Sequence, residues 1–293
     1  MIRLIASDMD GTLLDSYRKI TKENIQAIKQ LQENDINFII NTGREYQNVL
    51  EILGESGIKC DMICTNGSCA CDKDGKVLFH HAIPKETVQK IFSVFHKFDL
   101  VPTPFSLSGR LSILCHEDLK KYVKEVMIPA IQINHPDFVY TEKDYQELLN
   151  ATYLDGEEGL LNSDHEILKI VSNSLDPAAL KNLRIELEKI PGLAVVSTVP
   201  TDIEITSADA QKGIALMDYA KAKGYSPNEI VAIGDSENDY SMLSIPGIHS
   251  VAMANAVDMI QDICVYRTRE NTKDGIAYII QCILADRNNF ELL

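Results

Sequence analysis

The sequence predicts an α/β fold: a Rossmann-like parallel sheet with helices on both faces, interrupted by an inserted α+β domain. In the first third of the 293 residues, strands alternate with helices, which favours a parallel sheet with right-handed crossovers. The alternation gives way to a mixed pattern in the middle of the chain and then resumes. Hydrophobic residues make up 45% of the chain, enough for a substantial core. We expect a discontinuous core domain at residues 1–82 and 199–293, and an inserted domain at residues 83–198.

Short apolar runs and helix-start signals predict the N-terminal elements. Ile2–Ser7 has the length and character of a buried strand, and Gly11 marks a sharp turn after it. Thr21 is a suitable N-cap for the helix that follows, whose apolar residues recur at helical spacing. Further elements are expected as a strand at Ile36–Asn41, a helix at Glu45–Leu53 and a strand at Asp61–Thr65.

The inserted segment combines helices with short strands. Asp176 followed by Pro177 predicts a helix start, because aspartate caps helix N-termini and proline suits the first turn. Strands are expected in this segment at Leu111–Cys115, Leu168–Val171 and Ala194–Ser197. After it we expect core strands at Asp202–Thr206, Ile230–Gly234 and Ser250–Met253, and helices at Lys212–Lys223, Asn238–Leu243 and Gly275–Leu284.

Charge and composition narrow the partners. With 28 Lys and Arg against 43 Asp and Glu, the formal net charge is −15, which argues against a nucleic-acid partner. A small phosphorylated ligand needs only a few local cations or a metal ion. No apolar stretch approaches membrane-spanning length, so we expect no membrane partner. The sequence gives no indication of oligomeric state.

Cysteine usage favours a cytoplasmic protein. The seven cysteines are not accompanied by a secretion signal, which indicates reduced thiols. Cys64, Cys69 and Cys71 lie close together in the sequence but lack the paired spacing of common zinc sites. We therefore interpret them as ordinary thiols.

The first strand runs into Asp8-Met9-Asp10-Gly11-Thr12, which puts two carboxylates at one strand end. Like charges raise each other's pKa, so the pair favours a hard divalent cation between them. Asp8 is the candidate nucleophile that attacks phosphorus and forms an aspartyl phosphate. Asp10 is the candidate acid and base, protonating the departing alcohol and later deprotonating the attacking water. A polar turn that caps the strand is the alternative interpretation.

A second acidic pair follows the strand at Ile230–Gly234. Asp235 is the natural third oxygen ligand for a magnesium ion held by Asp8 and Asp10, and Asp239 could orient the inner ligands. If the segment is helical, the spacing of four residues puts both carboxylates on one face. The alternative is that they only favour the dipole of the next helix.

Two more segments could hold an anion. Thr42 and Gly43 follow the second strand, where a hydroxyl and backbone N–H groups can bind phosphate or simply cap a helix. Lys212 lies near a helix start, where the dipole disfavours a cation, so it is either paired with a carboxylate and phosphate or simply solvated. Arg44 could reach phosphate, although we favour a surface position. Asn66 and Asn255 either line the site or form turns.

Together these segments resemble the haloacid dehalogenase superfamily of phosphohydrolases, and within it the Cof-like branch. The superfamily motifs, in their usual order, are D-x-D-G-T at Asp8–Thr12, a strand-end threonine at Thr42, a lysine at Lys212 and G-D-x-x-N-D at Gly234–Asp239. The Cof-like features are N-T-G-R at Asn41–Arg44, N-G at Asn66-Gly67, A-M-x-N-A at Ala252–Ala256 and an acidic-Gly-aliphatic segment at Asp274–Ile276. The resemblance covers the core domain. Residues 83–198 match the family's large cap domain, inserted between the second and third motifs, only by length and position. Ala254 replaces a glycine that is common in the branch.

The resemblance implies a role for each matching residue. Asp8 would be nucleophile and metal ligand, and Asp10 would be the acid and base, with its backbone carbonyl rather than its carboxylate at the metal. Asp235 would bind Mg²⁺ directly. The phosphate group would be held by the backbone at Met9 and by Thr42, Gly43, Lys212 and Asn238.

We therefore expect a magnesium-dependent phosphatase that hydrolyses small phosphorylated metabolites, with sugar phosphates first among them. Large caps close over the site, so small substrates fit better than phosphoproteins. Two alternatives stay open: a phosphomutase of the same superfamily, and a sensor that binds a phosphorylated ligand without turnover. The sequence identifies neither the substrate nor the cap residues that select it.

Overall fold

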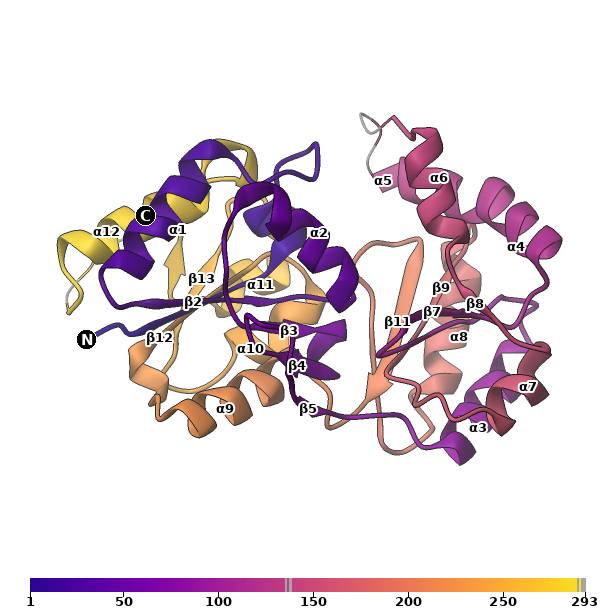
Figure 1. Cartoon of the computed structure of the whole chain (residues 1–293). Coiled ribbons are helices and arrows are strands. Elements are labelled where there is room, and N and C mark those ends of the chain that lie inside the picture. The colour runs from indigo at the N-terminus through magenta and orange to yellow at the C-terminus, as the bar shows by residue number, and fades with distance from the viewer. Residues whose placement is uncertain (135, 137–138, 289, 291–293) are drawn as a thin grey trace. The chain divides into compact units, whose positions relative to one another are not determined.

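The computed structural model describes residues 1–134, 136, 139–288 and 290, and it divides into two compact units. The first unit contains Met1–His80 and Ala210–Leu293, and the second contains His81–Asp209. Figure 1 shows that the first unit is formed by the two ends of the chain, with the indigo N-terminal elements beside the orange and yellow C-terminal ones. Each unit has its own sheet.

The first unit is built on an eight-stranded sheet in the order β14-β13-β12-β1-β2-β3-β4-β5. Its strands are β1 (Leu4–Ser7), β2 (Asn37–Asn41), β3 (Met62–Cys64), β4 (Cys69–Cys71), β5 (Val77–His80), β12 (Ile230–Gly234), β13 (His249–Ala252) and β14 (Tyr266–Arg267). The pairs from β14 to β3 are parallel, and β4 and β5 add an antiparallel edge. The predicted Rossmann-like parallel sheet is thus confirmed.

Helices cover both faces of this sheet. They are α1 (Lys22–Glu33), α2 (Tyr46–Ser56), α9 (Lys212–Lys223), α10 (Tyr240–Leu243), α11 (Asp258–Ile263) and α12 (Gly275–Ala285). In Figure 1, α1 and α12 lie together on one face and α9 and α10 on the other. Successive side chains of β1 point to opposite faces of the sheet. Leu4 and Ala6 belong to the hydrophobic cluster that packs against α9 and α10. The predicted N-cap is confirmed, since the Thr21 hydroxyl accepts a hydrogen bond from the backbone N–H of Asn24.

The second unit is a two-layer α+β module. Its sheet has the order β10-β11-β9-β6-β7-β8, with β6 (Thr103–Ser106), β7 (Gly109–Ser112), β8 (Thr152–Tyr153), β9 (Lys169–Asn173), β10 (Leu193–Val196) and β11 (Asp202–Ser207). Its helices are α3 (Lys85–Phe95), α4 (His116–Tyr122), α5 (Ile128–Asn134), α6 (Glu142–Leu149), α7 (Gly156–Asn162) and α8 (Pro177–Leu187). Ile170, Ile203 and Ile205 of the sheet pack in one core with residues of α3, α7 and α8. Asp176 caps α8 as predicted, accepting from the N–H groups of Ala178 and Ala179.

Several elements differ from the sequence prediction. The segment at 202–206 forms a strand, but this strand, β11, pairs with β9 and β10 in the second unit rather than in the core sheet. Every residue of β11 is buried, a pattern that suits a central strand of either sheet. The hairpin of β4 and β5 and the short β14 were not predicted, because runs of two to four residues carry little periodicity.

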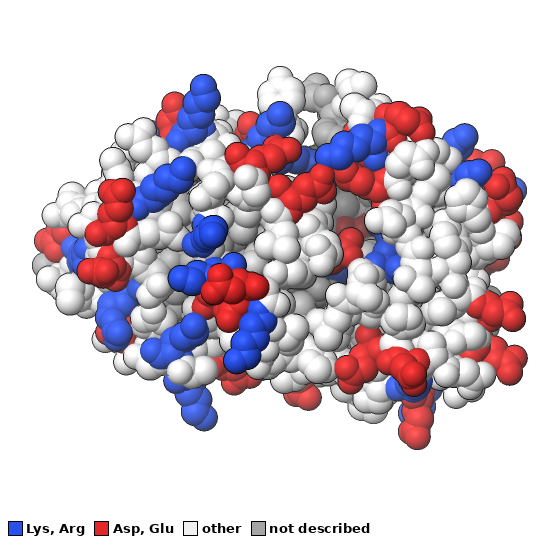
Figure 2. Space-filling model, viewed as in Figure 1, with Lys and Arg blue, Asp and Glu red and all other residues white. Residues whose placement is uncertain are grey.

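The visible face carries charges of both signs. Figure 2 shows acidic side chains interspersed with basic ones across it. Within the described part of the chain, no helix is both long enough and apolar enough to cross a bilayer.

Candidate active site

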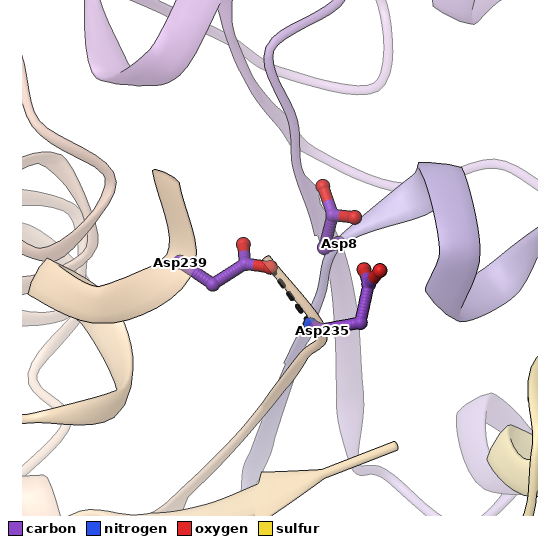
Figure 3. Close-up of side chains that lie close together, drawn as sticks. All are labelled: Asp8, Asp235 and Asp239. Carbon is purple, nitrogen blue, oxygen red and sulfur yellow. Dashed lines mark hydrogen bonds between the residues drawn. The ribbon is translucent and has the colours of Figure 1, made fainter. Parts of the chain in front are cut away.

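Asp8 and Asp235 meet at the carboxyl ends of two neighbouring strands. β1 and β12 pair in parallel with Ser7 opposite Ile233, so the residues that follow each strand emerge side by side. Together with Asp239 they form a group whose ligand atoms all lie within 4.8 Å of one another. In Figure 3 the three carboxylates converge on one region. Among the described residues, this is the group of His, Cys, Asp and Glu side chains that could hold a metal ion.

Lys212 is a buried cation between two of these carboxylates. Its Nζ donates to Asp8 Oδ1 at 2.6 Å and to Asp239 Oδ1 at 2.7 Å. The residue is 1% exposed although it begins α9, where the helix dipole disfavours positive charge. Burial acts to lower the pKa of Lys212, but the negative charges of Asp239 and Asp8 outweigh it and raise the pKa. The side chain is paired rather than solvated.

Asp239 fixes the loop that carries Asp235. It is fully buried, and its Oδ2 accepts hydrogen bonds from the backbone N–H groups of Asp235 at 2.9 Å and Ser236 at 3.1 Å. The two aspartates do not share a helical face, because Asp235 precedes the turn at Glu237–Asp239. With both oxygens of Asp239 engaged, its carboxylate is better placed to orient the group than to bind a ligand directly.

Asp235 is held by the turn that follows Asp8. The Thr12 hydroxyl donates to Asp235 Oδ1 at 3.0 Å. Gly11 has a φ of +74°, and a Cβ there would lie 2.3 Å from Asp235 Oδ2. A side chain at position 11 would therefore displace the carboxylate, which explains the glycine between Asp10 and Thr12 in physical terms.

The buried carboxylates carry more negative charge than Lys212 neutralises. Burial, followed by the charges of Asp239 and Asp10, raises the pKa of Asp8 to about 7 despite the ion pair with Lys212. Burial and the charges of Asp8 and Asp239 raise the pKa of Asp235 well above its usual range. A site built from hard oxygen donors with uncompensated negative charge fits a divalent cation.

Asp10 points to a different partner. Its two carboxylate oxygens accept from Nε and Nη2 of Arg44, each at 2.6 Å, and Arg44 also donates to Asn48 Oδ1. Crowding by neighbouring groups acts to raise the pKa of Asp10, whose side chain is 52% exposed, but the guanidinium charge and hydrogen bonds of Arg44 outweigh it and lower the pKa to about 2. Asp10 is thus a carboxylate in this arrangement, and its side chain lies outside the group formed by Asp8, Asp235 and Asp239.

The remaining predicted residues lie on the loops after β1, β2 and β12. Met9 is fully buried in the turn after Asp8. Thr42 is 1% exposed, and its hydroxyl oxygen accepts from the Arg44 backbone N–H at 3.2 Å; Gly43 lies between them. Asn238 is buried, and its Oδ1 accepts from the Ser236 hydroxyl at 2.9 Å. Each residue therefore lies at the strand end where the sequence predicts it.

Some contacts of the site were not predicted. Arg44 pairs with Asp10 instead of lying free on the surface, and the only sequence signal was its place in N-T-G-R. Asn66 accepts from Asn238 Nδ2 at 3.2 Å. Asn255 braces the turn after Asp8 by donating to the carbonyl of Gly11 at 2.8 Å. These contacts join segments up to 244 residues apart, so no local pattern could reveal them.

Comparisons with known proteins give matches that extend over nearly the whole chain. The family model described as haloacid dehalogenase-like hydrolase matches residues 5–280. Phosphatase YwpJ of Bacillus subtilis is 28% identical over 292 residues, which cover 97% of this chain and 100% of the relative. The 5-amino-6-(5-phospho-D-ribitylamino)uracil phosphatase YwtE of the same organism is 28% identical over 294 residues, covering 97% and 99%. A solved structure of a haloacid dehalogenase-like hydrolase from B. subtilis matches with a TM-score of 0.83 at 28% identity, covering 96% of this chain and 99% of that one.

Proposed function

Because this chain belongs to the haloacid dehalogenase-like hydrolases and is a phosphatase, we propose that it is Mg²⁺-dependent and cleaves a small phosphomonoester through an aspartyl phosphate. The observation that carries the proposal is the group of Asp8, Asp235 and Asp239 around the buried Lys212. A nucleophile, a countercharge and hard oxygen donors lie at one sheet edge, as phosphoryl transfer requires.

The first half-reaction transfers the phosphoryl group to Asp8. A carboxylate oxygen of Asp8 attacks phosphorus, the bond from phosphorus to the ester oxygen breaks, and the departing alkoxide takes a proton from Asp10. Lys212 holds Asp8 at 2.6 Å and supplies a positive charge beside the approaching phosphate. To donate a proton, Asp10 must leave Arg44, since the guanidinium keeps the pKa of Asp10 near 2.

The second half-reaction returns the carboxylate. Asp10, again a carboxylate, removes a proton from water, and the resulting oxygen attacks the phosphorus of the aspartyl phosphate. The bond between phosphorus and the Asp8 oxygen breaks, which releases inorganic phosphate and restores Asp8. In both steps the phosphoryl oxygens would be held by Thr42, Gly43, Asn238 and the backbone at Met9.

Mg²⁺ fits the residues that are present. Asp8 and Asp235 supply buried carboxylates with raised pKa values, and the family resemblance adds the backbone carbonyl of Asp10. When bound, the cation would neutralise these carboxylates and offset negative charge on the phosphoryl oxygens. Asp239 would support the site through its hydrogen bonds to the loop of Asp235.

For the substrate we propose a small phosphomonoester with a polyhydroxylated chain, such as a sugar phosphate. Support comes from YwtE, whose name places its phosphate on a ribityl chain. Other relatives of similar identity are named for different substrates. One is HMP-PP phosphatase of Yersinia pseudotuberculosis, which is 27% identical over 271 residues.

A panel of phosphorylated metabolites tests this proposal. The wild-type protein with Mg²⁺ should release inorganic phosphate from at least one sugar phosphate without forming an isomer of it. Excess chelator and Asp8→Asn should each stop the release.

Three outcomes would contradict the proposal. Isomer formation without phosphate release would indicate a mutase, binding without turnover would indicate a sensor, and full activity in chelator would remove the metal from the mechanism. Circular dichroism of Asp8→Asn serves as the control for folding.

A further inference from the structure

The turn between β3 and β4, Thr65–Gly67, has an unfavourable backbone conformation and is buried. Thr65, Asn66 and Gly67 have φ values of +56°, +57° and +96°. Positive φ is rare for side chains branched at Cβ, so Thr65 is a true outlier, and such residues persist only where their surroundings hold them. Thr65 is 3% exposed and Asn66 is 4% exposed. Contacts of this turn must therefore offset its conformational cost.

The turn is bound first to the loop that follows β2. The Thr65 N–H donates to the carbonyl of Arg44 at 2.8 Å, and the Asn66 N–H donates to the carbonyl of Thr42 at 3.0 Å. Residues 65 and 66 therefore fix the backbone on either side of Gly43.

The same turn contacts the other two loops of the proposed phosphate site. Asn66 Oδ1 accepts from Asn238 Nδ2 at 3.2 Å, in a position where both side chains are buried. Gly67 lies against the residue before Lys212, because a Cβ on Gly67 would come within 2.6 Å of the Gln211 carbonyl oxygen. One three-residue turn thus touches the loops that carry Thr42, Lys212 and Asn238.

We propose that Asn66 is a positioning residue for phosphate binding, acting through Asn238 and through the backbone of Thr42. The inference rests on the proposed function, which assigns phosphate to these loops. Asparagine meets two demands at once: it tolerates the left-handed conformation, and its side chain supplies an acceptor for Asn238. Glycine would satisfy the backbone without the acceptor, and aspartate would place a negative charge beside the Asn238 side chain.

The test separates the side chain from the backbone with Asn66→Gly. Calorimetric titration with inorganic phosphate in the presence of Mg²⁺ measures binding without requiring turnover. Losing one neutral hydrogen bond should weaken phosphate binding about fivefold. The melting temperature should change little, because the glycine adopts positive φ without strain and this offsets the cost of the lost hydrogen bond. A merely structural role would lower the melting temperature and leave phosphate affinity unchanged.

Asp35→Gly is the matched control, because Asp35 also has a φ of +57° but is exposed and remote from the predicted site residues. It should leave phosphate affinity at the wild-type value. The double variant Asn66→Gly with Asn238→Ala should bind phosphate no more weakly than Asn238→Ala alone, since both changes remove the same hydrogen bond.

Two results would overturn the inference: wild-type phosphate affinity in Asn66→Gly, or independent, multiplying effects in the double variant. Failure of the proposed function looks different, because the wild-type protein would then hydrolyse no phosphomonoester whatever Asn66 does. A wild-type protein that binds no phosphate would contradict both.

Discussion

At the residue scale, the charges of the site depend on Lys212. It is the buried cation that both Asp8 and Asp239 contact within 2.7 Å. Taking charges out of water is costly, and a buried pair is tolerable only when each charge has its partner. Removing the lysine would leave two buried carboxylates facing each other.

Lys212→Met should therefore lower both activity and stability. Breaking a buried ion pair costs about 3–5 kcal/mol, so the free energy of unfolding in urea should fall by about that amount, and phosphatase activity should be lost. Lys221→Met, an exposed position on the same helix, is the control and should change stability by less than about 0.5 kcal/mol. Equal stability of the two variants would refute the role given to Lys212.

The sequence indicates which residues belong to the site better than it indicates which residue each of them contacts. Lys212 was conspicuous because a cation stands where the helix dipole opposes it. The partner of Arg44 was not predictable, because Asp10 lies 34 residues away and several acidic residues could compete for it. The choice depends on how the loops after β1 and β2 approach each other in the folded chain.

At the element scale, the turn between β3 and β4 leaves no room for a side chain on Gly67. Its φ of +96° strains any other residue, and the Gln211 carbonyl oxygen would lie 2.6 Å from an added Cβ. Gly224, at the end of α9, also has positive φ, but nothing lies within 4 Å of an added Cβ there. Alanine variants at these two positions therefore separate the cost of backbone strain from the cost of a clash with the Gln211 carbonyl oxygen.

Gly67→Ala should be more damaging than Gly224→Ala. Both variants incur the cost of a left-handed alanine, about 1 kcal/mol, but only Gly67→Ala must also displace the backbone before Lys212. Urea unfolding should show a larger loss of stability for Gly67→Ala, and kcat/KM should fall in that variant alone. Indistinguishable behaviour of the two variants would show that the close packing against Gln211 has no consequence.

β11 carries a carboxylate whose titration should affect stability. Burial and the charge of Glu204 raise the pKa of Asp202 from 3.8 to about 6, although hydrogen bonds from Thr198 and Val199 oppose this. The native state therefore holds this proton more tightly than the unfolded chain does. The contribution of Asp202 to stability is complete at low pH and is lost as pH rises through the native pKa.

Asp202→Asn removes this titration. From about pH 4.5 to pH 6.5 the stability of the variant should improve relative to that of the wild type, as measured by urea unfolding at each pH. The control is Asp209→Asn, which removes an exposed carboxylate of the same unit, and the pH-dependent change of Asp202→Asn is judged against it. A constant difference between Asp202→Asn and the wild type would show that Asp202 titrates normally.

Elements with clear signals were predictable, and short ones were not. Thr21 and Asp176 indicated their helices because each supplies a side-chain oxygen to a free backbone N–H. The strand at β11 was recognised but assigned to the wrong sheet, since pairing partners are set by tertiary contacts rather than by local pattern. The β4–β5 hairpin was missed because β4 has only three residues.

At the scale of the whole molecule, the alternation of strands and helices at both chain ends predicted the core sheet. It also predicted that the site lies at the carboxyl ends of the parallel strands. Parallel strands bring their carboxyl ends to one edge, so the sequence alone is enough to group residues as distant as Asp8 and Asp235. What binds in the second unit could not be derived in the same way, because its polar residues follow no motif.

Binding of Mg²⁺ should be visible in the stability of the whole protein. At about ten times its dissociation constant, the cation should raise the melting temperature by about 3 °C. The rise should be larger at pH 8 than at pH 6, because Asp8, with a pKa of about 7, must lose its proton to bind a cation.

Asp235→Asn should abolish this thermal shift, whereas Asp218→Asn, on the exposed part of α9, should retain it. A shift of equal size in Asp235→Asn would place the cation elsewhere on this acidic chain.

The central claim is that Asp8 carries the phosphoryl group, and rapid acid quenching with a radiolabelled phosphomonoester tests it most directly. The claim predicts label bound to the wild-type protein within the first turnover, its release by hydroxylamine as expected of an acyl phosphate, and no label on Asp8→Asn. Phosphate release by the wild type with no label on the protein, or equal labelling of Asp8→Asn, would contradict it.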